Sequence, residues 1–401
     1  MSEQHGEELI RTEDQTQVLD RVPELEGEKV LPVEIVHVYV YDIGRAVDLK
    51  KAAAKIPAYP DIGFGKRRDT PSSLTLPKPL VLTLSTEECD AKCFEKFTAL
   101  AKIYDDGALT LVVRYRTHSS FKDLASNSNL AVSDVSGSES VEQFADSSFQ
   151  MVVNAIKDAV TGLKENWVFD RETYTAFCVL ECPADSPESF LYQNREVAAA
   201  LLAGEEPGVL HDSQVRQILE KPHSYRKNDI AIFDFDRCII IDPTRDYEDV
   251  LLIAEHANYR LIELRALDSL LDKWLDEAER DIRKLYLSGG KTRFGQRAVK
   301  IKLGKLQTLR FDALFTLENL DNSSKIIGDY FLGLIYERLC SIFNTESWKI
   351  SVGKRLDALQ NVYELLKNDT AERRMLTLEI VFIIVCIVLP AIQIVQVMMA
   401  G

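Results

Sequence analysis

The sequence predicts an α+β N-terminal half, followed by an all-α helical hairpin or stalk and one C-terminal transmembrane helix. Short β-rich runs alternate with helical segments before residue 185, and helical periodicity dominates after Pro243. No charged residue occurs from Ile380 to Gly401. Interleaved strands and helices are typical of mixed folds, and a long uncharged run is typical of a membrane span.

Composition limits the protein class. The chain has 401 residues, of which 46% are hydrophobic and 28% are charged, so it can bury a core in two or three domains. A net charge of −15 argues against a uniformly basic nucleic-acid binder, and seven scattered cysteines argue against a secreted disulfide scaffold. We divide the chain into a disordered acidic tail (1–30), an α+β domain (31–185), small helices plus a β-hairpin (186–245), a helical stalk (246–374) and a transmembrane anchor (375–401).

The amino end is polar and acidic. Residues 1–28 include nine acidic side chains and no apolar run of the kind that a signal peptide requires. We therefore expect this end to be a flexible tail that stays in the cytoplasm.

The first half alternates strands and helices. We expect strands where apolar and β-branched residues alternate, at 31–41, 80–84, 108–115 and 173–180. Helices are expected at 43–56, 86–104 and 141–166. The proline-rich residues 57–79 and the Ser-, Asn- and Asp-rich residues 119–140 are expected to be loops.

The second half begins with short elements and becomes helical. Helices are expected at 191–202, closed by Gly204, and at 212–219, and a β-hairpin is expected at 230–242. Long amphipathic helices are then expected at 247–286, 294–320 and 326–343. A fourth helix starts near Trp348 and has no breaker before the uncharged run.

The uncharged run predicts a single-pass anchor. As a helix it would span about 33 Å, which matches a hydrocarbon core of about 30 Å. Arg373 and Arg374 precede the run, so the positive-inside rule places the body in the cytoplasm. Gln393 and Gln396 within the run favour helix–helix hydrogen bonds and a homo-oligomer. The alternative is a buried core helix of a soluble protein.

A basic tip is predicted between the first two long helices. From Arg280 to Arg310 there are ten basic residues and one acidic residue. If the helices alternate up and down, this tip lies far from the bilayer, beyond the reach of lipid headgroups. We therefore expect an acidic protein or RNA partner there, and the alternative is a solvated helical face. The candidate partner-binding residues are Lys291, Arg293, Arg297, Lys300, Lys302 and Lys305.

Candidate catalytic and metal patterns are weak. Asp234 and Asp236 resemble the first motif of haloacid-dehalogenase-type phosphatases, in which the first Asp is a nucleophile, but a hairpin turn explains them better. Gly289-Gly290-Lys291-Thr292 lacks the earlier glycine of a phosphate-binding loop. Two cysteine pairs (Cys89 and Cys93, Cys178 and Cys182) have spacings that are wider than usual for structural zinc. We expect no catalytic residue, metal or cofactor.

Several motifs of the second half together resemble one family. They are Ser224-Tyr225-Arg226-Lys227-Asn228-Asp229-Ile230, Glu255-His256-Ala257-Asn258, Leu261-Ile262-Glu263-Leu264-Arg265, Leu270-Leu271-Asp272, Trp348, Lys354, Arg355, Leu356, Tyr363 and Leu378-Glu379-Ile380. This order resembles the required-for-meiotic-nuclear-division (DUF155-like) family, especially its bacterial-type relatives. The eukaryotic members carry a glycine in the hairpin turn, where Asp236-Arg237 stands here. The resemblance implies a C-terminally anchored, oligomer-prone protein without enzymatic activity.

We therefore expect a non-enzymatic, membrane-tethered scaffold that recruits a cytosolic partner. One alternative is a subunit of an oligomeric channel or transporter with a stalk helix like that of CorA-type magnesium transporters. A weaker alternative is a phosphatase that uses Asp234.

Overall fold

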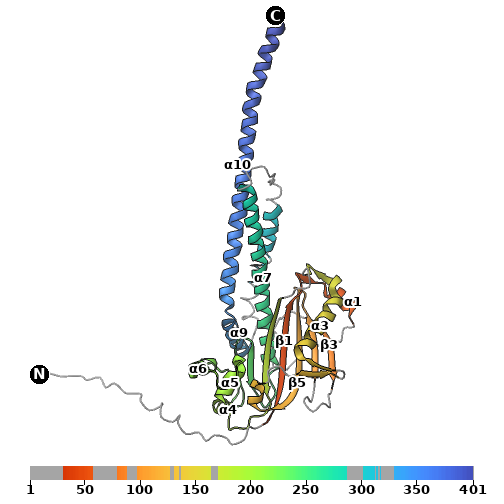
Figure 1. Cartoon of the computed structure of the whole chain (residues 1–401), viewed down its shortest axis with the longest axis vertical. Helices are drawn as coiled ribbons and strands as arrows, with labels where there is room; N and C mark the ends of the chain where they lie inside the picture. Colours follow the sequence, from red (N-terminus) through yellow and green to blue (C-terminus); the bar gives the residue numbers. More distant parts are fainter. Residues whose placement is uncertain are drawn as a thin grey trace, which may run out of the picture.

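The chain forms an α/β body and a long helical stalk (Figure 1). The computed structural model describes residues 30–56, 79–87, 97–126, 131–134, 137–163, 170–286, 301–311, 313–314, 317 and 329–400. The fold therefore has the predicted α+β N-terminal half and helical C-terminal half. The division of the chain at residues 185, 245 and 374 stays a prediction.

A seven-stranded mixed sheet organises the body, in the order β10-β11-β9-β1-β5-β4-β3. Its strands are β1 (Leu31–Asp42), β3 (Leu80–Glu87), β4 (Phe97–Ile103), β5 (Ala108–Ser119), β9 (Asp170–Val179), β10 (Ile230–Phe233) and β11 (Arg237–Ile241). The central strand β1 pairs antiparallel with β5 and β9, whereas β11 pairs parallel with β9. The β10–β11 hairpin thus extends the sheet of the N-terminal half. Two small ladders join β2 (Ala46–Val47) to β8 (Val160–Thr161) and β6 (Ala131–Asp134) to β7 (Gly137–Ser140).

Each face of the sheet has its own core, because alternate residues of a strand point to opposite faces. On one face Ile35 and Tyr41 of β1 pack with Phe149 and Leu201. This face carries α1 (Leu49–Lys55), α2 (Phe121–Ser126), α3 (Val141–Ile156), η1 (Lys157–Ala159), α4 (Pro187–Gln193) and α5 (Arg195–Ala203), which is followed by α6 (Asp212–Ile218).

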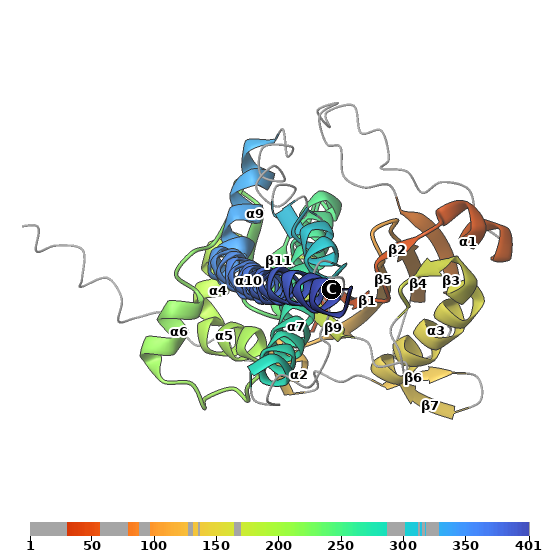
Figure 2. The same ribbon diagram turned by 90° about the horizontal axis from the view of Figure 1, so that it is seen from above.

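On the other face Val36 and Val38 of β1 pack with Tyr259 and Ile262 of α7 (Glu248–Tyr286) and with Ile335 of α9 (Tyr330–Ile342). Seen from above, α7 and α9 lie on one side of the sheet, with α1 and α3 on the other (Figure 2).

The stalk has a third core. Leu271 and Ala278 of α7 pack with Leu306 of the helical segment 301–311 and with Leu359 and Tyr363 of α10 (Thr345–Ala400). Ion pairs reinforce this core along its length.

Arg355 of α10 lies 2.8 Å from both Asp268 and Asp272 of α7. Lys302 pairs with the buried Asp281 and lies 2.7 Å from Glu277. The Tyr363 hydroxyl donates to Asp281 over 3.5 Å. In these contacts the residue numbers increase in the same direction along α7 and α10, so the two helices run parallel.

Most predicted elements are confirmed. They are the four strands around 31–41, 80–84, 108–115 and 173–180, the hairpin, the helices around 191–202 and 212–219, and the helices around 247–286, 326–343 and 348 onward. Gly204 ends α5 with a φ of 70°, a left-handed conformation that glycine adopts without strain. Of the helix predicted at 294–320, the structure describes 301–311 and a few later residues as helical.

Four local predictions are wrong in whole or in part. Residues 97–103 form strand β4 instead of continuing a helix from residue 86, because Phe97, Ala99, Ala101 and Ile103 alternate inward while β4 pairs with β3 and β5. Sheet pairing there outweighs the local helix preference. The predicted loop 119–140 contains α2 and the β6–β7 ladder, and the predicted helix 141–166 ends at Ile156. Only the end of the predicted helix 43–56 is helical, and the loop predicted at 57–79 lies almost wholly outside the described residues.

His256 makes the body sensitive to acid. Its ring lies in α7 between Tyr259 and Tyr336, at centroid distances of 6.0 and 5.8 Å. Burial, with the nearby charge of Arg260, lowers the pKa of His256 to about 3. An unfolded chain protonates histidine near pH 6.5, so the folded state loses stability as pH falls from 6.5 toward 3.

The free energy of unfolding of the wild type falls between pH 7.5 and pH 4.5. We expect this fall to be smaller by about 2 to 3 kcal/mol in His256→Phe. Phenylalanine keeps an aromatic ring between the two tyrosines but cannot take up a proton. Denaturant unfolding of both proteins at the two pH values measures the difference. Identical pH dependence in wild type and variant would contradict this account.

Asp281 holds the stalk together, because its carboxylate is buried and joins all three helical segments. Asp281→Asn should lower the free energy of unfolding by about 1 to 3 kcal/mol, since a charged partner of Lys302 is lost. The matched control is Glu279→Gln on the exposed face of α7, which removes a surface pair with Arg283 and should cost less than about 1 kcal/mol. Equal effects of the two variants would show that Asp281 has no special role in the stalk.

Candidate functional site

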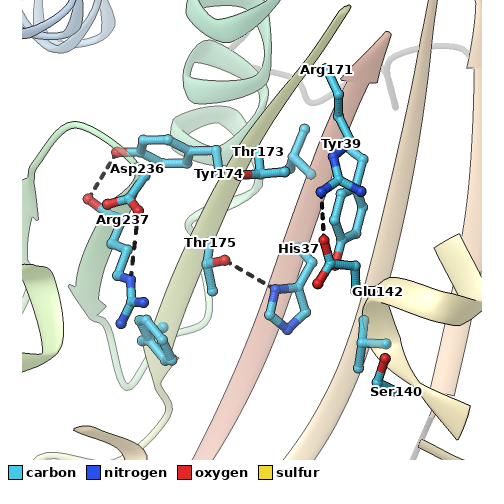
Figure 3. Close-up of a pocket in the computed structure, with 13 residues that line it drawn as sticks. His37, Tyr39, Ser140, Glu142, Arg171, Thr173, Tyr174, Thr175, Asp236 and Arg237 are labelled. Carbon is cyan, nitrogen blue, oxygen red and sulfur yellow. Dashed lines mark hydrogen bonds and ion pairs between the residues drawn. The ribbon is translucent and has the colours of Figure 1, made fainter. Parts of the chain in front are cut away.

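A polar pocket of about 230 Å³ opens on the sheet face that carries α3 and α5. Strands β1 and β9 form its floor, the start of α3 forms one wall, and the β10–β11 turn forms the opposite wall (Figure 3). The polar residues that line it include His37, Tyr39, Glu142, Arg171, Thr173, Thr175, Asp236 and Arg237.

Three polar side chains form a cross-strand row on this floor. Arg237 of β11 is paired with Thr175 of β9, which is paired with His37 of β1. In the adjacent rows of the same face Ile35 pairs with Phe177, and Tyr39 pairs with Thr173. Thr173 is exposed although β9 is an interior strand of the sheet. The sheet face is therefore uncovered at this place.

His37 is held as a neutral hydrogen-bonding group. Its Nδ1 lies 3.0 Å from the Thr175 hydroxyl, and its Nε2 lies 3.1 Å from the Tyr115 hydroxyl. Burial, together with the charge of Arg237, lowers the pKa of His37 to about 4. At neutral pH one ring nitrogen thus donates a hydrogen bond and the other accepts one.

Each wall of the pocket has one arginine, and the two arginines differ in their ionic partners. Arg237 donates from Nη1 to the Leu201 carbonyl over 3.0 Å, and its Nε lies 4.0 Å from the Asp236 carboxylate. On the α3 side, Arg171 donates to Glu142 over 2.5 Å and to Asp146 over 3.0 Å. Arg171 is therefore neutralised by two carboxylates, whereas Arg237 donates to one backbone carbonyl, lies beside one carboxylate and keeps 18% of its side chain exposed.

The aspartates of the candidate phosphatase motif form the hairpin turn beside this pocket. The Asp234 backbone N–H donates to the Arg237 carbonyl over 2.8 Å, and the Asp234 carboxylate accepts from Phe235 N–H over 2.8 Å. Strand β11 follows directly. The interpretation as a hairpin turn is thus confirmed.

Of the two cysteine pairs noted in the sequence, the structure describes one. Cys178 is buried within β9 and Cys182 is partly buried, while Cys89 and Cys93 lie outside the described residues. Within the part of the chain that the structure describes, no group of three His, Cys, Asp or Glu side chains could hold a metal ion.

The described helix ends beside the predicted basic tip lie at the opposite end of the stalk from the place that the sequence suggested. Of its candidate partner-binding residues, Lys302 pairs with α7 and Lys305 is exposed, whereas Lys291, Arg293, Arg297 and Lys300 lie outside the described residues. The expected up-and-down order is wrong because α9 lies back against the sheet before α10 begins. Since α10 runs parallel to α7, the described ends beside the tip, Tyr286 and Ile301, point toward the C-terminus (Figure 1).

The last part of α10 exposes large apolar side chains. Exposed residues follow one another around the helix: Met375, Leu376, Leu378, Ile380, Val381, Phe382, Ile383, Ile384, Val385, Ile387, Val388, Leu389 and Ile392. In Figure 1 this part projects beyond the other stalk helices. Among the described residues, no helix has both the length and the apolar character that a membrane crossing requires.

The pocket is not predicted from the sequence. One signal was present, because His37 interrupts an otherwise apolar and aromatic strand face. Its partners Thr175 and Arg237 lie far away in the sequence, and strand register alone brings them together.

Comparison with known proteins identifies the body of the chain. Residues 33–248 match the family described as "Uncharacterized protein MJ0711, N-terminal domain". Uncharacterized protein MJ0711 of Methanocaldococcus jannaschii is 28% identical over 209 residues, which are 52% of this chain and 61% of that protein. The chain thus spans about three fifths of the length of this relative. No solved structure matches.

The match ends at residue 248 and includes the first of the motifs that resemble the required-for-meiotic-nuclear-division family, Ser224 to Ile230, whereas the later motifs lie beyond it, and that family label is not confirmed. The matched residues run from β1 to the first residue of α7 and include every strand of the large sheet. On this evidence the chain belongs to the family of the uncharacterized protein MJ0711 N-terminal domain.

Proposed function

We propose that this protein is a non-enzymatic scaffold that is tethered to a membrane by the end of α10 and recruits a partner through its α/β body. The observation that carries the proposal is the change in character along this one helix. Leu359, Tyr363 and Leu366 are buried in the stalk, whereas the large side chains from Met375 to Ile392 are exposed.

An exposed apolar surface of this kind is stabilised by burial against lipid or another protein. Burial of each large apolar side chain contributes about 1.5 to 3 kcal/mol relative to exposure to water. The apolar residues surround the helix instead of forming one stripe, and an all-round apolar helix suits lipid better than a single protein face. The absence of charge from Ile380 to Gly401 agrees with this pattern. These features support a C-terminal anchor.

The stalk sets the distance between body and bilayer. Arg355 marks the level at which α10 pairs with Asp268 and Asp272, above the sheet. From there to Ile380 the helix rises about 38 Å, at about 1.5 Å per residue. A tethered body would therefore stand clear of the headgroups and could bind a soluble partner.

The basic tip contributes a second contact in this arrangement. Asp281 lies beside Tyr363, and α7 continues about 8 Å farther to Tyr286, while α10 rises about 26 Å from Tyr363 to Ile380. The tip thus starts about 18 Å from the start of the uncharged run. Because these described helix ends point toward the uncharged run, we infer that acidic headgroups, instead of an acidic protein or RNA, are the partner of the basic tip.

The other candidate functions have less support. A channel would need several copies of α10 in one membrane, and homo-oligomer formation stays a prediction. A phosphatase would use Asp234, whose carboxylate instead caps the hairpin turn. Kinship with the required-for-meiotic-nuclear-division family remains a proposal that rests on the motifs after Ser224.

Removal of the chain after Asn368 tests the anchor. We expect the full chain to need detergent for extraction from membranes and to float with lipid vesicles, and the shortened chain to do neither, because the exposed apolar residues are absent from it. Circular dichroism of the shortened chain serves as the control for folding. A full chain that stays in solution without detergent would contradict the tether.

Charge reversal tests the contact of the tip with lipid. Lys291, Arg293, Arg297, Lys300 and Lys305 are changed to Glu, and Lys302 is retained because it pairs with Glu277 and Asp281. In wild-type protein we expect amide hydrogen exchange of residues 280–305 to be about tenfold slower in nanodiscs with acidic phospholipid than in neutral nanodiscs, since each basic residue contributes about 1 kcal/mol.

The variant should exchange at the same rate in both lipids. The matched control, Lys221→Glu with Lys227→Glu, changes two exposed lysines after α6 and should behave as wild type. If wild-type exchange is insensitive to lipid and the tip instead retains RNA or an acidic protein, the headgroup contact is wrong.

A further inference from the structure

The pocket on the sheet has features that a membrane scaffold does not require. Its floor contains a row of polar side chains, Arg237, Thr175 and His37, on the sheet face that elsewhere carries an apolar core. Polar groups at such positions are costly for folding unless they are hydrogen-bonded, and apolar residues there would extend the core. The pattern therefore suggests a binding site in addition to the tether.

We propose that this pocket binds a small molecule through one oxyanion group, a carboxylate or a phosphate, which the Arg237 guanidinium and the threonine hydroxyls of β9 recognise. This inference goes beyond the scaffold function and does not depend on the anchor.

The position of Arg237 supports recognition of an anion. Its Nη1 is used by the Leu201 carbonyl, and the Asp236 carboxylate is half-exposed at 4.0 Å from Nε. A guanidinium has five N–H donors in a planar fork that matches carboxylate and phosphate oxygens. Gly204 makes room for it, because a Cβ at that position would lie 3.0 Å from Arg237 Nη2.

The hydroxyl groups on the floor supply uncharged donors. Thr175 contacts His37, which is neutral at pH 7 and can use either ring nitrogen as the acceptor. Thr173 lies in the neighbouring row, is exposed, and lines the same pocket. An oxyanion beside Arg237 can therefore accept hydrogen bonds from the floor as well as from the guanidinium.

The far wall limits the ligand to one anionic group. Glu142 lines the pocket there, and Arg171 is already bound by Glu142 and Asp146. A second anionic group would be repelled, while an amino or hydroxyl group could donate to Glu142. The volume of about 230 Å³ lies below the usual range for drug-sized ligands and fits a molecule of amino-acid size.

Calorimetric titration of the full chain in detergent tests the proposal. The probes are acetate, glycine and inorganic phosphate, with chloride at matched ionic strength as the reference. We expect at least one oxyanion to bind with a dissociation constant of about 1 mM, which is typical of so small a ligand. Acetate and glycine report a carboxylate site, and phosphate reports a phosphate site.

Variants connect the binding to the pocket. Arg237→Gln should weaken the binding about tenfold or more, and Thr173→Val about threefold, since a charged hydrogen bond contributes more than a neutral one. Thr173 is exposed, so Thr173→Val keeps the proposal testable if Arg237→Gln fails to fold. Arg195→Gln on α5 is the matched control: it removes an exposed arginine outside the pocket and should bind as wild type. No binding above the chloride reference, or equal binding by wild type and both pocket variants, would overturn the proposal.

Discussion

The structure depends on α7, a single helix that belongs to two hydrophobic cores. Its first half buries Tyr259 and Ile262 against the sheet, and its second half buries Leu271 and Ala278 in the stalk. A continuous helix does not bend freely, so the direction of the stalk relative to the sheet is fixed by the packing of α7 on β1 and β9. The orientation of α10 follows from this, because Arg355 and Tyr363 contact α7 in parallel order. The apolar end of α10 is therefore aimed away from the body.

The sequence predicts those helices and strands whose formation depends mainly on neighbouring residues. Alternation in β1, the left-handed Gly204 after α5 and the long apolar periodicity of α7 and α10 each depend on a few neighbouring residues. Strand β4 was missed because its sequence, FTALAKI, has an ambiguous preference, and its pairing with β3 and β5 decides the outcome. The direction of the basic tip was missed for a different reason. It depends on α9, whose Ile335 and Leu339 return the chain to the sheet, and that is a tertiary contact.

Strand β1 separates the two functional features of the body. Val36, Val38 and Val40 point toward α7 and support the stalk, while His37 and Tyr39 point to the opposite face and line the pocket. Successive residues of one strand thus serve different faces, as the pleat of a sheet requires. A protein tethered through α10 would present the pocket on the face turned away from α7, so a diffusing ligand would not have to pass the stalk.

The extent of the family match distinguishes the sheet from the stalk. The match ends at residue 248, where α7 begins, and it contains every strand whose residues form the pocket. The stalk and the apolar end of α10 lie outside it. The sheet is therefore the unit that this chain shares with the family, whereas the stalk determines where the sheet is held. Because the pocket row of Arg237, Thr175 and His37 is created by strand register within that shared unit, a ligand of the pocket is a property to look for in the body itself, independently of any membrane.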